Sequence, residues 1–214
     1  GLAVTPMVLA NYPLQATQFP PFNERCRNGE FEVIYCGRLG LDQKLDVVIR
    51  SVADWPEGTK LTLIGQDDTA AARHLRDMVV KLGVTERVHF AGWLDLPDAE
   101  TRIAKANLGF ALLDSSTAQW RTALGASNKR YQLMKAGLPQ IGDFNPGVPE
   151  LIEGNGVGAC VHAHEPDEIT LLVRAYAADE TRCRVEGERA FALHQAEFNY
   201  ERAFERLLEQ VGTW

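Results

Sequence analysis

Short apolar stretches alternate with amphipathic stretches over most of this chain. Val33–Gly37 is an apolar run of strand length. The segment after it, Lys44–Trp55, spaces its apolar residues along one face of a helix. The same alternation predicts further strands at Leu61–Gly65, Val88–Trp93, Leu108–Leu113, Gln140–Phe144 and Ala159–His162. The helices predicted between them are Ala70–Leu82, Asp98–Ala106, Asn128–Ala136 and Val148–Glu153.

Short apolar strands separated by amphipathic helices are typical of a parallel sheet that is covered by helices on both faces. Crossover connections between parallel strands are right-handed. The predicted fold class is therefore α/β, a Rossmann-like doubly wound parallel sheet with C-terminal helices. Those last helices are predicted at Pro166–Ala178, Glu180–Gln195 and Tyr200–Val211. We expect them to pack on the edge of the sheet and not to form a separate domain.

The beginning of the chain has a different composition. Residues 1–29 are rich in proline and weakly periodic, which predicts an extended linker or entry segment. The folded domain is accordingly expected to span residues 30–214. A chain that opens with a linker leads us to expect a further part of the protein upstream.

Composition limits the classes of function. The 214 residues, 45% of them hydrophobic, suffice for one well-buried core. No run has the roughly 18–20 apolar residues that span a bilayer, and no export signal is visible. The net charge of −7 argues against general nucleic-acid binding. It does not exclude a small anionic ligand, because the binding of such a ligand depends on the local charge of its site.

The cysteines and histidines do not suggest a metal site. Cys26, Cys36, Cys160 and Cys183 lie far apart, and such scattered cysteines are most often buried in a reducing compartment. The histidines at 162 and 164 lack a set of ligand-spaced partners. We expect no metal and no cofactor.

Ligands of an open α/β sheet bind beyond the carboxyl ends of its strands. The first loop at that edge, Gly37–Lys44, offers a glycine for close approach and two candidate phosphate partners, Arg38 and Lys44. Its sequence is not a P-loop, and the chain has no G-x-G-x-x-G fingerprint. A classical NAD(P) site is therefore not supported.

The segment Ser127–Glu153 carries the strongest candidate site. Its predicted helix starts with Asn128, Lys129 and Arg130, so that backbone N–H groups and two cations would point into one loop. This arrangement suits an anion, above all a phosphate. The alternative is that both cations are ordinary solvated charges on a surface helix.

Several segments together resemble a known family. The pieces VIYCGRLGLDQKLDVVI, KLTLIGQ, RVHFAGW, ANLGFALLDSS, SNKRYQLMKAGLPQIGD and GVPELIEGNGVGACV occur in order between about residues 30 and 211. This ordered set resembles the C-terminal, nucleotide-sugar-binding domain of GT-B glycosyltransferases, particularly the group 1 family of retaining enzymes. The resemblance implies a hexosyltransferase-like donor domain of carbohydrate biosynthesis. It implies that a missing N-terminal domain of the same protein holds the acceptor.

The resemblance also implies roles for particular residues. An arginine and a lysine of the first loop contact the donor diphosphate in the family; Arg38 matches the first. Gln43 stands where the lysine is usual, with Lys44 one place later. Trp93 follows the turn near which the family places the nucleobase, with packing as the alternative.

The family's pair of glutamates is missing. The second, which binds the ribose hydroxyls, falls on Gln132, and the first, near the donor sugar, falls on about Leu124. Gln132 still has an amide that bonds hydroxyls, whereas Leu124 cannot replace a carboxylate. No catalytic residue is therefore identified. The donor-binding candidates are Gly37, Arg38, Gln43, Lys44, Trp93, Ser127, Asn128, Lys129 and Gln132.

Three functions remain open at this point. The first is a donor-binding domain for a nucleoside-diphosphate sugar, inactive by itself. The second is a degenerate, non-catalytic nucleotide-binding or interaction module. The third is a nucleotide-sugar epimerase of the same fold, for which the sequence offers no clear set of catalytic acids and histidines. The expected compartment is the cytoplasm, with peripheral contact at the inner membrane left open through the absent domain.

Overall fold

The computed structural model describes residues 9–16 and 30–212. Its core is one sheet of six parallel strands in the order β3-β2-β1-β4-β5-β6. The order reverses between β1 and β4, which is the switch point of a doubly wound sheet. The predicted fold class is confirmed. The strands are β1 Phe31–Cys36, β2 Thr59–Ile64, β3 Val88–Gly92, β4 Leu108–Ala111, β5 Gln140–Asp143 and β6 Gly158–Val161.

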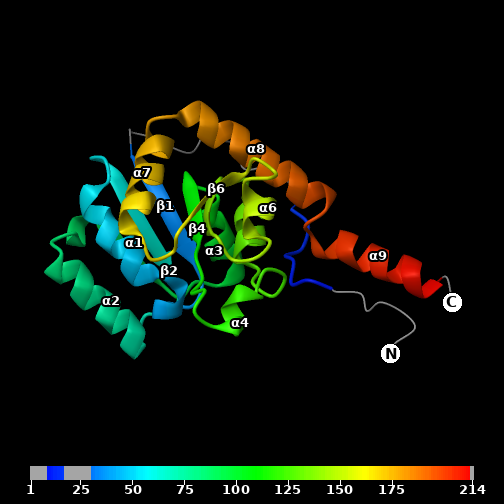
Figure 1. Cartoon of the computed structure of the whole chain (residues 1–214), viewed down its shortest axis with the longest axis horizontal. Coiled ribbons are helices and arrows are strands. Elements are labelled where there is room, and N and C mark those ends of the chain that lie inside the picture. The colour runs from blue at the N-terminus through cyan, green and yellow to red at the C-terminus, as the bar shows by residue number, and fades with distance from the viewer. Residues whose placement is uncertain (1–8, 17–29, 213–214) are drawn as a thin grey trace.

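One face of the sheet is covered by helices α1 (Leu45–Ser51), α2 (Ala70–Lys81) and α7 (Pro166–Ala177), as Figure 1 shows. Their apolar residues join inward-facing residues of the strands in the largest hydrophobic cluster. That cluster buries Val33 and Tyr35 of β1 and Leu61 and Leu63 of β2, whereas Ile34 and Ile64 belong to the cluster on the other face. A parallel strand between two helical layers has no solvent-facing side.

The other face is covered by α3 (Leu96–Ile103), α5 (Lys129–Lys135) and α6 (Val148–Ile152). Helix α8 (Glu180–Ala196) packs in turn on α5. Helix α4 (Ala118–Arg121) is a single turn in the loop after β4. The switch point of the sheet thus lies between α3 and α5, which flank it on this face.

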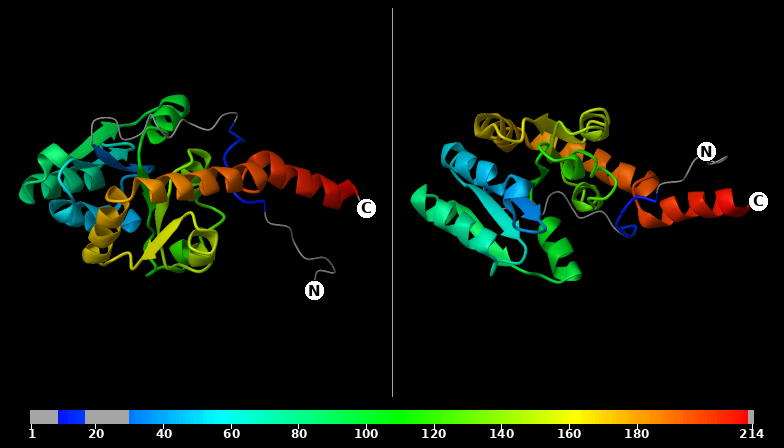
Figure 2. Two further views of the ribbon diagram at one scale, coloured as in Figure 1. Left: turned by 90° about the horizontal axis from the view of Figure 1, so that it is seen from above. Right: turned by 60° about the horizontal axis from the view of Figure 1, so that its bottom comes forward.

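Residues 9–16 and the C-terminal helix lie on the same side of the molecule (Figure 2). Helix α9 (Tyr200–Gly212) continues from α8 and projects away from the sheet (Figures 1 and 2). Residues 9–16 have no helix or strand and lie against the junction of α8 and α9. The remaining part of the predicted linker lies outside the described residues.

Two of the element boundaries that differ from the sequence prediction have clear local reasons. The first predicted helix, Lys44–Trp55, begins one residue late, because Lys44 has a left-handed φ of 54° between a 3-10 turn and α1, and it ends as a 3-10 turn at Val52–Asp54. Helix α3 starts two residues early, because the Asp95 side chain accepts a hydrogen bond from the Asp98 N–H and Pro97 fits the first turn. The α4 turn was not predicted.

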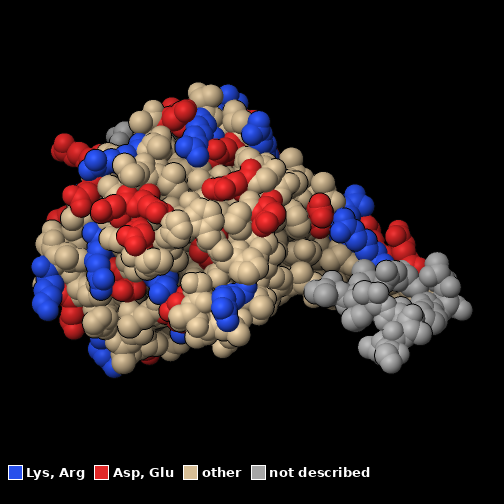
Figure 3. All heavy atoms as spheres, viewed as in Figure 1, with Lys and Arg blue, Asp and Glu red and all other residues tan. Residues whose placement is uncertain are grey.

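Charged side chains of both signs are interspersed over the face in Figure 3. No continuous basic surface is visible on that face among the described residues. None of the helices in the described ranges is both long and apolar enough to cross a membrane.

Candidate functional site

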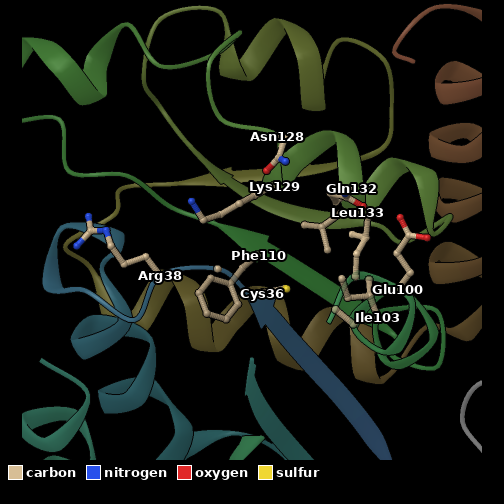
Figure 4. A pocket seen from close by; sticks show the side chains of 12 residues that line it. Cys36, Arg38, Glu100, Ile103, Phe110, Asn128, Lys129, Gln132 and Leu133 are labelled. Carbon is tan, nitrogen blue, oxygen red and sulfur yellow. The ribbon is translucent and has the colours of Figure 1, made fainter. Parts of the chain in front are cut away.

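A cavity of about 340 Å³ opens at the switch point of the sheet, between α3 and α5. Its floor is the carboxyl end of β1, where the chain turns at Cys36 and Gly37. Figure 4 shows that its polar side chains gather at two ends. Arg38 and Lys129 lie at one end, and Gln132 and Glu100 lie at the other.

The cationic end contains a lysine without an anionic partner. Lys129 makes no ion pair with a carboxylate among the described residues, and its ammonium lies 6.0 Å from the centre of the Tyr35 ring. Burial lowers the pKa of Lys129, and the neighbouring Arg130 and Arg38 lower it further. A half-buried cation beside other cations is electrostatically unfavourable, so an anion bound here would be stabilised.

Arg38 is the second cation at this end. Its guanidinium pairs with Asp42, four residues further along the same loop, yet 61% of its side chain is exposed. It also lies 5.9 Å from the centre of the Trp120 ring. Because exposed pairs of this kind are weak, Arg38 is free to turn toward an anion in the cavity.

Gly37 is needed at the floor of the cationic end. Its φ is +150°, and a Cβ at this position would lie 2.6 Å from Cε of Lys129. A larger residue would therefore push Lys129 out of the cavity. The sequence expectation that Gly37 allows a close approach fits this geometry.

The middle of the cavity is apolar. Leu96, Ala99 and Ile103 of α3 face Leu133 of α5 across it. Cys36 lies on the floor, where burial raises the pKa of its thiol. A thiol that stays protonated is a poor nucleophile, so Cys36 offers contact surface and not covalent chemistry.

Glu100 at the far end was not among the sequence-predicted residues. It stands on α3, next to the apolar positions that face the cavity, and its Oε1 accepts a hydrogen bond of 2.5 Å from Lys135 on α5. The helical spacing of Leu96, Ala99 and Ile103 could have indicated it, because Glu100 lies four residues after Leu96. Only the pairing of α3 with α5 shows that it faces the same cavity as Gln132.

Five of the nine predicted donor-binding residues line this cavity, and four do not. Those that line it are Gly37, Arg38, Asn128, Lys129 and Gln132. The side chains of Asn128 and Gln132 make no hydrogen bond within the described residues, so both amides are open to a ligand.

Gln43 and Lys44 are already engaged elsewhere. Gln43 is 1% exposed, and its Oε1 accepts a hydrogen bond of 3.2 Å from the Tyr35 hydroxyl. Lys44 forms an ion pair of 3.0 Å with Asp114 at the end of the β4 loop. Both therefore hold the first loop together, and the structure does not place either at the cavity.

Trp93 and Ser127 also lie off the cavity. The Trp93 side chain is 73% exposed, which is inconsistent with the alternative that it is packed. Ser127 Oγ is buried and makes no hydrogen bond in the described part of the chain. Their roles as donor contacts stay predictions.

The expectation that Arg130 would be a second cation in the loop is wrong, and so is the alternative of a solvated charge. Arg130 is completely buried, and its Nη2 donates to Asp143 at 2.6 Å and to the Ala111 carbonyl at 3.0 Å. Leu124, at the position of the family's first glutamate, packs beside Tyr131 in the cluster under α6.

Other polar residues that follow β4 and β6 lie outside the cavity. Ser115 and Ser116 are exposed, and the Ser116 N–H donates to Asp114 in a local turn. His162 pairs with Glu168 on the surface. Within the described ranges no group of three or more His, Cys, Asp or Glu side chains is placed to hold a metal ion.

Comparisons with known proteins identify the family of this chain. The model of the family described as glycosyl transferases group 1 matches residues 30–179. None of the curated proteins matches the chain by sequence.

Several solved structures share the fold. HepE from Anabaena, solved with UDP-glucose, has a TM-score of 0.74 at 19% identity, over 86% of this chain and 49% of its own. Sucrose-phosphate synthase from Thermosynechococcus elongatus has a TM-score of 0.74 at 20% identity, over 91% and 50%. WaaG, a glycosyltransferase involved in lipopolysaccharide biosynthesis, has a TM-score of 0.69 at 19% identity, over 92% and 55%. This chain thus spans about half the length of each of these three structures.

Proposed function

Because the chain belongs to the group 1 glycosyl transferases, we propose that it is a domain that binds the nucleoside-diphosphate sugar from which a glycosyl group is transferred. The observation that carries the proposal is Lys129, a half-buried cation without an ion-pair partner in the described residues, beside Arg38 in the switch-point cavity. Two cations at the carboxyl ends of parallel strands are suited to a diphosphate.

The chemistry of the cavity supports the same ligand. A nucleoside diphosphate has anionic phosphates at one end, the ribose with its hydroxyl groups next to them, and a flat base with hydrogen-bonding edges at the other end. The cavity is cationic at Arg38 and Lys129, apolar in the middle, and lined by hydrogen-bonding groups at Gln132 and Glu100 (Figure 4). The HepE structures, solved with UDP, UDP and glucose, or UDP-glucose, make a uridine nucleotide the first candidate ligand.

Transfer to an acceptor requires groups that this chain does not supply in the cavity. Leu124 and Gln132 occupy the positions at which the resemblance implies two carboxylates. The chain also spans about half of its structural neighbours, so we place the acceptor site on a further domain of the same protein. The isolated chain is expected to bind donor weakly and to transfer no sugar.

Calorimetric titration with UDP, GDP and ADP tests the proposal. We expect one nucleotide to bind, and Arg38→Ala and Lys129→Ala each to weaken that binding by about ten-fold or more, the value of one charge-assisted hydrogen bond. Arg50→Ala is the matched control for Arg38, because Arg50 also pairs on the surface with an aspartate four residues away. Unchanged affinity in both variants would show that the diphosphate site lies elsewhere.

A second candidate function is nucleotide binding without any transfer. The packing of Leu124 against Tyr131 favours it, because that position is apolar and cannot carry a catalytic carboxylate. Incubation of the full-length protein with a radiolabelled donor distinguishes the two functions. Release or transfer of the sugar supports the glycosyltransferase, whereas binding with no turnover supports the non-catalytic module.

A further inference from the structure

We propose that the Asp42 carboxylate competes with a bound diphosphate for Arg38 and thereby lowers the affinity of the switch-point cavity for its ligand. This role rests on the proposed function and concerns how tightly the cationic end of the cavity holds an anion. Asp42 is not among the residues that line the cavity, whereas Arg38 is. The carboxylate therefore acts on the ligand through the guanidinium with which it pairs.

The guanidinium of Arg38 is held by its own loop. Figure 4 shows it directed away from Phe110 and the apolar middle of the cavity. Its Nη2 donates to Oδ2 of Asp42, and its Cζ lies 5.9 Å from the centre of the Trp120 ring. To reach a phosphate in the cavity, the side chain has to leave this carboxylate. The two anions thus compete for one guanidinium.

The ion pair depends on the absence of a side chain at Gly40. A Cβ at this position would lie 2.5 Å from Nη1 of Arg38 and within the same distance of Oδ1 of Asp42. The backbone of Gly40 is extended, with a φ of −133°, which any residue can adopt. Gly40→Ala therefore displaces the flexible ends of both side chains without straining the loop. This substitution separates the pair and keeps both charges.

Asp42 loses little when Arg38 leaves it. The Nε2 group of Gln43 donates to Oδ2 of Asp42 at 3.2 Å, and 26% of the Asp42 side chain is exposed. A carboxylate with a second donor and access to water is stable without the guanidinium. A phosphate of the ligand offers Arg38 a bidentate partner in exchange.

The size of the effect follows from the strength of the pair. A ligand that needs Arg38 unpaired binds with an apparent affinity that is reduced by the fraction of molecules in which Arg38 is unpaired. An exposed ion pair favours its closed form by a factor of about two to five. Removal of the pair should therefore strengthen binding, which is the opposite of the effect expected for Arg38→Ala.

The loss of the pair can be separated from the loss of a charge. Burial lowers the pKa of Lys129 and the charge of Asp42 raises it, so this charge also reaches the second cation of the site. A carboxylate that acted by its charge alone would change the affinity by the same factor with or without Arg38. Competition for Arg38 predicts a gain that depends on Arg38.

The experiment is a calorimetric titration of wild type, D42N, G40A, R38A, R38A/D42N and the control D46N with UDP, GDP and ADP. Asp46 is the matched control, because it also pairs with an arginine four residues away, but that residue, Arg50, does not line the cavity. We expect D42N and G40A to bind the preferred nucleotide about two- to five-fold more tightly than wild type. D46N should match wild type, and R38A/D42N should show at most a small part of the gain relative to R38A.

Three results would overturn the role of Asp42 while wild type still binds and the proposed function stands. Weaker binding by D42N would mean that Asp42 orients Arg38 toward the ligand. An equal gain in the presence and absence of Arg38 would mean simple repulsion between Asp42 and the diphosphate. An equal gain in D46N would mean a general effect of net charge. If wild type binds none of the three nucleotides, the proposed function itself fails, and the role of Asp42 fails with it.

Discussion

At the scale of single residues, the most consequential contact is the ion pair between Arg130 and Asp143. The Asp143 carboxylate accepts hydrogen bonds from Arg130 and from the backbone N–H groups of Leu113 and Asn145, each at 2.6–2.9 Å. Burial lowers the pKa of the Arg130 guanidinium, and the charge of Asp143 opposes that shift. The pair therefore joins α5 to the loops after β4 and β5, beside the cavity.

Removal of one member of this pair should be costly. Asp143→Ala leaves the buried Arg130 charge uncompensated, and we expect a loss of about 3–5 kcal/mol in the free energy of unfolding. Urea denaturation measures it. Asp46→Ala, which breaks a surface pair with Arg50, is the control and should cost less than about 1 kcal/mol. A similar small loss in both variants would contradict the structural role.

At the scale of elements, the contact between α5 and α8 depends on a glycine inside a helix. Gly187 lies in the middle of α8, and a Cβ at this position would lie 2.4 Å from the Gly137 carbonyl oxygen. That oxygen belongs to the backbone after α5, which cannot move as a flexible side chain can. Close approach of the two segments thus requires a residue without a side chain.

The substitution Gly187→Ala therefore has two effects of opposite sign on the free energy of unfolding. Helix propensity alone favours alanine over glycine by about 1 kcal/mol. The clash with Gly137 forces the helices apart, and we expect a net destabilisation of about 1–3 kcal/mol in thermal or urea unfolding. The control is Thr181→Ala, at an exposed position of α8. It changes helix propensity alone and should not destabilise the folded protein. Stabilisation of the Gly187 variant would show that α8 packs more loosely than in this structure.

At the scale of the whole molecule, α8 holds residues 9–16 against the C-terminal part of the described chain. The Ala16 N–H donates to Nε2 of His194 at 3.1 Å, and Nδ1 of His194 bonds the Phe198 carbonyl at 2.9 Å. Nδ1 must carry the proton in this arrangement, so the imidazole is neutral. Tyr12 packs beside Tyr131 and Phe198, with ring centres 4.5 and 5.7 Å away.

This arrangement predicts a pH dependence. Burial lowers the pKa of His194 below 6.5, and the carbonyl of Phe198 opposes that shift. The unfolded chain takes up a proton at its ordinary pKa while the folded chain does not, so the stabilisation is complete above about pH 6.5 and is lost as the pH falls toward the folded pKa. Unfolding free energies between pH 7.5 and 5 should fall more steeply in wild type than in His194→Gln. Parallel curves would contradict the neutral, buried state of His194.

The sequence alone determined the class of the fold and its family. The alternation of short apolar runs with amphipathic segments is local, so it specifies strands and helices of a parallel sheet without knowledge of contacts. Gly37, Arg38 and Lys129 could be proposed at one site, because the carboxyl ends of parallel strands meet at one edge of the sheet.

Tertiary structure decided which polar residues face that site. Gln43 and Arg130 have polar side chains, but both are buried. The first loop folds over Gln43, and Arg130 forms an ion pair with the buried Asp143. Glu100 looks like an ordinary surface residue of a helix until α3 is placed against α5. Helical spacing shows which residues share a face, but only the packing of one element on another shows what that face meets.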